Sequence, residues 1–284
     1  MRACILFVVA TTATATADDA VDRKVNADVE RGQELWEQSC PVAPVDGACV
    51  RLVSKPIIKG AIPSRCGPDH VPEIVVIPRD AAKVRAATAA FHDAIVELEA
   101  HGGDARAAYA RAKLAEIDVD YEAFLAVTVP AHLDFRVKAN VDKFSNWIAA
   151  KKGAAHALKD KVQRLADLHD PASTIASAAR LGQIALGVTN TLYTSEIPPE
   201  LKTDISSVDG YCDRMVDTAD PFEHETFDSF KSCLALSTKL AWFDDSSRIC
   251  ERGLSRIRPE DYPLVIEHHL DPTATVPIEV EGPR

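Results

Sequence analysis

The chain has 284 residues and a formal net charge of −11, with 43 acidic side chains against 32 basic ones. An acidic surface of this kind repels phosphate backbones and anionic lipid, which argues against a nucleic acid as partner. After the first residues, no apolar run approaches the roughly 20 residues that a membrane-spanning helix needs, so we expect no transmembrane span. Alanine, leucine, glutamate and lysine dominate the middle of the chain, and because these residues favour helices, the sequence predicts a mostly α fold.

The N-terminus has the layout of a cleavable secretory signal. Residues 1–2 carry positive charge, residues 5–9 are apolar, and residues 15–17 have small side chains. These are the three parts of such a signal. A frayed or buried N-terminal strand would also fit this pattern. Cleavage after residue 17 would remove Cys4 and leave six cysteines in an exported chain.

The next two segments differ in composition. Residues 18–35 are polar and charged, which predicts a linker or a short helix. Residues 36–78 are rich in cysteine and proline, and the β-branched runs at 50–53 and 74–77 predict small strands or extended segments. Because such a segment has little apolar core, we expect disulfides to hold it, and an oxidising compartment would preserve them.

The candidates for disulfides are the six cysteines beyond the signal: Cys40, Cys49, Cys66, Cys212, Cys233 and Cys250. We expect Cys40 to pair with Cys49 or Cys66, and one bridge to join two helices among the C-terminal three. That leaves either a bridge between the two halves or one unpaired thiol in each half. Cys66 and His70 could act as ligands of a zinc ion. Structural zinc ligands are usually paired two to four residues apart, however, and the cysteines here are more widely spaced.

A helical period runs over residues 79–263, which we expect to form antiparallel hairpins. Glycine, proline and charged residues predict the breaks between helices, for example the Lys-Lys-Gly sequence at 151–153 and the Asp-Pro sequence at 220–221. The proline-rich residues 264–284 predict a loosely ordered tail. The expected helices cover residues 84–98, 104–116, 121–127, 137–148, 154–168, 173–193, 208–215 and a final helix–turn–helix over 222–263.

Paired helices raise the question of an internal repeat. Residues 178–185 keep the Leu-Gly pair of the tetratricopeptide motif, and residues 87–94 and 105–112 keep its second half, although alanine-rich amphipathic helices also produce such matches by chance. The stretches IASAARLGQIALGVTNTLYTSEIPPELK and SCLALSTKLAWFDDSSRICERGLSRIRPEDYP resemble exported tetratricopeptide-like proteins of myxobacteria and their relatives. Motility-associated periplasmic and outer-membrane proteins belong to this group.

The resemblance covers residues 65–265 and includes the stretch RCGP…VVIPRDAAKV. It implies an irregular tetratricopeptide-like stack of helical hairpins after the cysteine-rich segment, in the periplasm or at the outer membrane. It also implies a role as a helical scaffold in an envelope assembly, bound to other envelope proteins and without catalysis. Because the chain lacks well-formed consensus repeats, the resemblance does not imply a regular concave groove for peptides.

Sequence signals for chemistry are weak, so we predict no catalytic residue, no metal site and no cofactor. Residues 118–122 begin like a calcium loop, but Ala123 stands where glycine is needed and Val129 where a bidentate glutamate is needed. An acidic helix start is the better interpretation. Three further acidic residues fit a solvated edge better than a catalytic pair: Asp217, Asp220 and Glu223.

Three aromatic residues are candidates for a partner-binding surface: Trp242, Phe243 and Trp147. Aromatic side chains dominate interface hot spots, whereas packing at a helix junction is the competing interpretation. The sequence thus favours a non-catalytic protein–protein interaction scaffold in a bacterial envelope assembly. The alternative is a cysteine-based metal- or redox-responsive binding module, and a hydrolytic enzyme has only scattered histidines in its favour.

Overall fold

The computed structural model describes residues 10–54, 62–68, 71–101 and 106–264. Within these ranges it is mostly α-helical with a small sheet near the N-terminus, which confirms the predicted fold class. The helices are α1 (Ala10–Ser39), α2 (Ala81–His101), α3 (Arg106–Leu125), α4 (Lys138–Ala166), α5 (Pro171–Tyr193), α6 (Ile205–Leu240) and α7 (Asp245–Ile257). The remaining elements are the strands β1 (Val50–Val53) and β2 (Glu73–Val76) and the 3-10 turn η1 (Pro199–Leu201).

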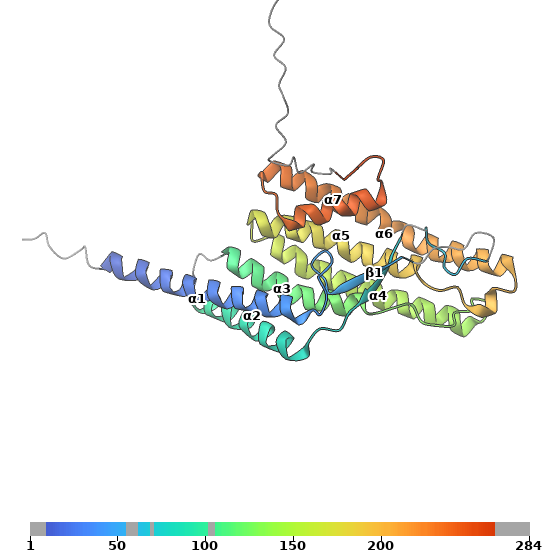
Figure 1. The fold of residues 1–284 in the computed structure, drawn as a ribbon, viewed down its shortest axis with the longest axis horizontal. Coiled ribbons are helices and arrows are strands. Elements are labelled where there is room, and N and C mark those ends of the chain that lie inside the picture. The colour runs from blue at the N-terminus through green and yellow to red at the C-terminus, as the bar shows by residue number, and fades with distance from the viewer. Residues whose placement is uncertain (1–9, 55–61, 69–70, 102–105, 265–284) are drawn as a thin grey trace, which may run out of the picture.

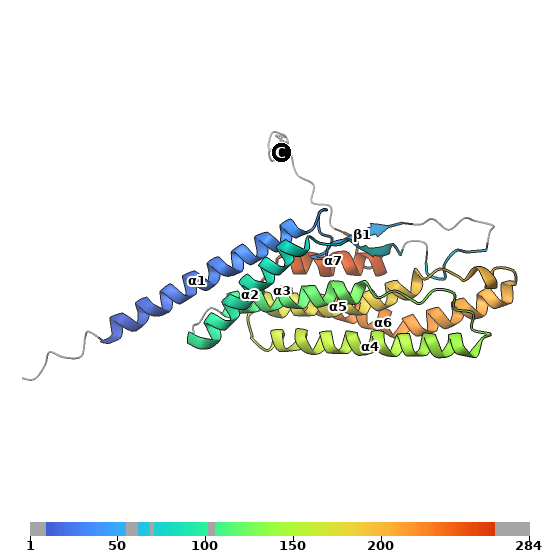
Figure 2. The same ribbon diagram turned by 90° about the horizontal axis from the view of Figure 1, so that it is seen from below.

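The four helices α3 to α6 lie side by side along the long axis and form an elongated bundle (Figures 1 and 2). Helix α5 packs against α4 and α6, and α7 runs back along α6 and also contacts α5. At one end, α1 and α2 form an antiparallel pair, and the N-terminal part of α1 projects beyond the bundle (Figure 2). The helices are therefore adjacent mainly to their neighbours in sequence, as in a series of hairpins.

The two strands form an antiparallel sheet that lies against α5. Val50 is opposite Val76, and Val53 is opposite Glu73. The Asn190 side chain links β2 to the bundle, because it accepts a hydrogen bond from the Ile74 amide at 3.2 Å and donates to the Pro72 carbonyl at 2.5 Å. The predicted strands are present, the second beginning one residue earlier than expected.

Three apolar clusters make up the core. The largest lies mainly among α3 to α6, the second joins α1, α2 and α3, and the third joins α5, α6 and α7. Phe230 of α6 is central to the third cluster, since its ring lies against Gly182 of α5 and Gly253 of α7. A side chain at either glycine would overlap the ring, so these two glycines allow the three helices to approach closely.

Three predicted helix breaks do not exist. Helix α3 continues through the gap expected at 117–120, α4 continues through residues 151–153, and α6 continues through Pro221. Gly153 is tolerated because glycine in a helix costs only about 1 kcal/mol, which the packing of α4 against α3 and α5 offsets. At these three positions, the tertiary contacts of the flanking residues outweigh the local preference for ending a helix.

Lys151 shows why the break in α4 was mispredicted. We expected it to interact with the end of its own helix, but its buried ammonium donates to the Phe124 carbonyl, near the C-terminal end of α3, and to the Val127 carbonyl at 2.9 Å. Burial lowers the pKa of Lys151 to about 8. Lys151 therefore interacts with the C-terminal end of the neighbouring helix α3, where a cation is favourable, and not with the end of its own helix.

Pro221 lies inside α6 without ending it. A proline removes one backbone hydrogen bond from a helix, and here the flanking Ala219, Phe222 and Thr226 are all buried in the bundle. The Thr226 hydroxyl adds a hydrogen bond to the Phe222 carbonyl at 2.7 Å. Packing on both sides of the proline therefore keeps the helix continuous.

The segment predicted as a linker or short helix is part of the long helix α1. Val25 and Val29 are fully buried against α2, and this apolar stripe was hidden among many charged residues. Residues 10–17 of the predicted signal also belong to α1. Residues 1–9, with Cys4, and the predicted tail from residue 265 onward lie outside the described residues, so cleavage of a signal stays a prediction.

Candidate functional site

All six candidate cysteines are paired in three disulfides: Cys40–Cys49, Cys66–Cys212 and Cys233–Cys250. The first closes a short loop after α1, the second joins the cysteine-rich segment to α6 across 146 residues, and the third joins α6 to α7. The alternatives left open by the sequence are thereby resolved. The two halves are bridged, and one helix-to-helix bridge is present as expected.

The turn between α6 and α7 holds two of the three aromatic candidates. Helix α6 ends at Leu240, and the next residue, Ala241, caps it in a left-handed conformation with φ of 50°. The Asp244 carboxylate then accepts hydrogen bonds from the amides of Ser246 at 2.9 Å and Ser247 at 3.2 Å, and the Ser247 hydroxyl accepts from the Asp244 amide at 3.2 Å. This reciprocal capping box fixes the start of α7.

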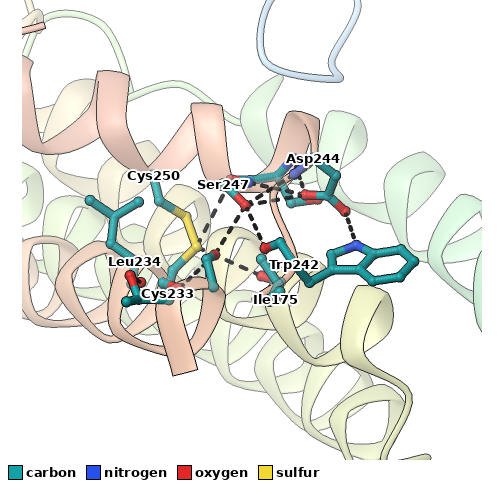
Figure 3. The surroundings of a disulfide bond; sticks show 10 residues. Ile175, Cys233, Leu234, Trp242, Asp244, Ser247 and Cys250 are labelled. Carbon is teal, nitrogen blue, oxygen red and sulfur yellow. Dashed lines mark hydrogen bonds between the residues drawn. A yellow bond between two sulfur atoms is a disulfide. The ribbon is translucent and has the colours of Figure 1, made fainter. Parts of the chain in front are cut away.

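The disulfide beneath this turn restrains it further (Figure 3). Cys233 and Cys250 are fully buried, and one helical turn away the hydroxyl groups of Ser237 and Ser247 are 3.0 Å apart and hydrogen-bonded. The Trp242 indole N–H donates to Asp244 at 3.2 Å, so the tryptophan ring is also held in place. Both helices and the connecting turn therefore form one restrained unit.

Trp242 and Phe243, which we call the aromatic tip, are exposed to solvent. The exposed fraction is 45% for Trp242 and 71% for Phe243. Trp147, the third candidate, does not belong to this surface, because it is 9% exposed and stacks on Phe144 with ring centroids 5.7 Å apart. For Trp147 the packing interpretation is therefore the correct one, since its position on α4 faces the bundle.

The loop closed by the first disulfide connects the N-terminal segment to α7. Its Asp46 accepts hydrogen bonds from Arg252 at 2.7 Å and from Arg256 at 3.0 Å. Gln183 of α5 donates to the Asp46 carbonyl at 2.7 Å. Asp46 and Gly47 have positive φ values of 52° and 82°, and the Asp-Gly pair was the sequence signal for such a turn, although nothing in the sequence indicated its partners.

A buried ion pair lies behind the same loop. Arg79 and Glu122 form two hydrogen bonds of 2.8 and 2.7 Å, and Glu122 also accepts from the Cys49 amide at 2.7 Å. The Arg79 guanidinium lies 3.9 Å from the centre of the Trp36 ring. This network joins α1, the first disulfide and α3, and sequence reasoning missed it because the four residues are far apart in the chain.

The acidic run at 118–122 lies in the interior of α3 and not at a helix start, so that interpretation was wrong. Asp118 pairs with Arg180 at 2.5 Å, and Asp120 pairs with Lys161 at 2.5 Å. Burial raises the pKa of Asp118 to about 6, with the charge of Arg180 opposing the shift. These carboxylates thus bind cationic side chains of α4 and α5, which ties the bundle together.

Comparisons with known proteins found no relative of this chain. No family model, curated protein or solved structure matches the chain. In the part of the chain that the structure describes, no helix combines the length and apolarity needed to cross a bilayer. Within the same part, no three histidine, cysteine, aspartate or glutamate side chains are grouped so that they could hold a metal ion.

Proposed function

We propose that this protein is a non-catalytic scaffold that binds other proteins of a bacterial cell envelope through its aromatic tip. The observation that carries the proposal is the exposure of Trp242 and Phe243 on a turn fixed by a disulfide and a capping box. Aromatic anchors of this kind supply most of the binding energy at protein interfaces. An anchor held on rigid elements also loses little entropy on binding.

Export to the envelope is supported by the three disulfides, because oxidising compartments preserve them. The signal-like N-terminus and the resemblance to exported tetratricopeptide-like proteins favour the periplasm or the outer membrane. The alternative, a metal- or redox-responsive module, requires thiolates. All six candidate cysteines are engaged in disulfides, and four of them are buried, so this alternative is less well supported.

The experiment is a pull-down from an envelope extract with immobilised full-length protein and variants of the tip. We expect Phe243→Ala and Trp242→Ala each to weaken capture of a specific partner by about tenfold or more, the size of a hot-spot effect. The matched control is Val96→Ala on α2, which also truncates an apolar side chain that is 49% exposed. This variant should capture the partner as the wild type does.

Circular dichroism of the same variants shows whether the fold is kept, which we expect because both tip residues are exposed. Equal capture by the wild type and by both tip variants would contradict the proposed surface. Failure of the wild type to capture any specific partner would contradict the scaffold function itself.

A further inference from the structure

A cavity lies where the sheet and the segment before β2 meet α5, α6 and α7. Its volume is about 140 Å³, and its walls are mainly aliphatic: Leu52, Val71, Ile74, Leu186 and Ile257. This volume is close to that of an engineered apolar cavity of about 150 Å³ that binds benzene. Sites for small ligands are commonly found between separate parts of a fold, and this cavity, which we call the sheet–helix cavity, has that location.

Contacts that do not involve a ligand hold its walls in place. The disulfide from Cys66 to α6 anchors the segment that supplies the sheet. Asn190 of α5 is hydrogen-bonded to the Ile74 amide at 3.2 Å, and Arg256 of α7 is hydrogen-bonded to Asp46 at 3.0 Å. Because the cavity is formed in advance, a ligand would not have to order its walls, which favours binding.

The polar groups of the cavity indicate the head group of its ligand. Arg256 is paired with Asp46, and the Thr226 hydroxyl donates to its own helix. Glu223 accepts a hydrogen bond of 2.5 Å from the Tyr193 hydroxyl, which occupies one of the roughly four acceptor positions of a carboxylate. A carboxylate with further acceptor positions beside an apolar cavity suits a protonated amine.

We propose that the sheet–helix cavity binds a small organic amine whose apolar part has about the size of a benzene ring. The ammonium group is bound by Glu223, and the apolar part contacts Leu52, Ile74 and Leu186. The site is separate from the aromatic tip, so the proposal does not depend on the scaffold function.

The test is a ligand-observed NMR titration of the full, disulfide-bonded protein with three probes: benzylamine, benzene and benzoate. We expect benzylamine to bind most tightly, benzene more weakly and benzoate most weakly, because the carboxylate of benzoate is repelled by Glu223. Binding of benzoate as tightly as benzylamine would overturn the assignment of the head group. If none of the three probes binds, the cavity is not a ligand site.

Two variants locate the bound molecule. Glu223→Gln should weaken benzylamine by about tenfold or more, the effect of losing a charged hydrogen bond, and leave benzene unchanged. Leu52→Phe should abolish binding of both probes by filling the cavity. Its control is Val53→Phe, because the next residue of a strand points to the opposite face.

Equal losses in the Leu52 and Val53 variants would overturn the proposed location. If the Leu52 variant does not fold, the Glu223 variant still decides, since an unchanged affinity for benzylamine contradicts the proposal.

Discussion

The two ends of the helical series are held by different means. The pair α1–α2 is long and is packed through an apolar stripe that includes the fully buried Val25 and Val29. Helix α7 has only 13 residues, and just Ser247, Cys250, Gly253 and Leu254 are buried. It is held by a disulfide to α6, a capping box and the Asp46 ion pairs.

This difference shows where the fold uses covalent and polar restraints. A long amphipathic pair is stabilised by burial of apolar area, and it needs few specific contacts. A short helix with little apolar area is not held by burial alone, so it needs specific restraints. Helix α7 also adjoins the aromatic tip, for which the proposed binding role requires a fixed conformation. The following predictions test this division, from the largest expected effect to the smallest.

Glu122→Gln should be the most destabilising change, because it leaves the buried Arg79 without a counter-charge. We expect a loss of about 3–5 kcal/mol in the free energy of unfolding, measured by urea denaturation. The control is Asp120→Asn on the same helix, which breaks a pair with Lys161 whose two side chains are about half exposed. That change should cost less than about 1 kcal/mol. Similar losses for the two variants would contradict the importance of the buried pair.

Replacing Cys233 and Cys250 together by alanine should cost about 3 kcal/mol, the value expected for a closed loop of this length. The comparison of the two ends predicts that the loss is local. Hydrogen exchange should show faster exchange of the amides of α7 while those of α2 stay protected. Uniformly faster exchange in both helices would show that the disulfide stabilises the whole fold and not α7 in particular.

Protonation of Asp118 should make the folded protein more stable at lower pH. Its pKa is about 6 in the folded protein, above the ordinary value of 3.8, so the folded state binds more protons than the unfolded state between these values. Stability should therefore rise as the pH falls from about 6 to 4. Relative to Asp118→Asn, the wild type should gain about 2 kcal/mol between pH 7 and pH 4 in urea denaturation. Parallel profiles for the two proteins would contradict this role.

Gly253→Ala should destabilise the contact between α6 and α7 by about 1–2 kcal/mol, because the added methyl group overlaps the ring of Phe230. Gly210→Ala is the matched control, since a side chain at this position of α6 has no neighbour within 4 Å. Alanine there should raise the stability by up to about 1 kcal/mol. Thermal unfolding compares the two variants, and equal shifts in Tm would contradict the close packing at Gly253.

The sequence predicted the features that depend on local patterns. The mostly α fold, the two small strands and the final helix–turn–helix follow from periodicity and from β-branched runs, and these predictions are confirmed. The helix breaks at Gly153 and Pro221 were wrong, because packing on both sides of these residues outweighs their local preference.

The ionic contacts could not be predicted from the sequence. Asp46 meets Arg252 across 206 residues and Arg79 meets Glu122 across 43, and a single sequence contains no sign of such pairs. The sequence likewise left several disulfide pairings open, and only the fold decided between them. For the aromatic candidates, the sequence could not distinguish the exposed Trp242 from the buried Trp147, since both lie near apolar helix positions.

The most direct test of the account is site-specific photo-crosslinking in an envelope preparation. A photoreactive phenylalanine analogue is placed at Phe243, in the restrained tip, or at Val96, an exposed apolar position of α2. We predict a discrete crosslinked product with a partner protein from position 243 and none from position 96. A product from position 96 alone, or from neither position, would contradict the claim that the aromatic tip is the partner-binding surface.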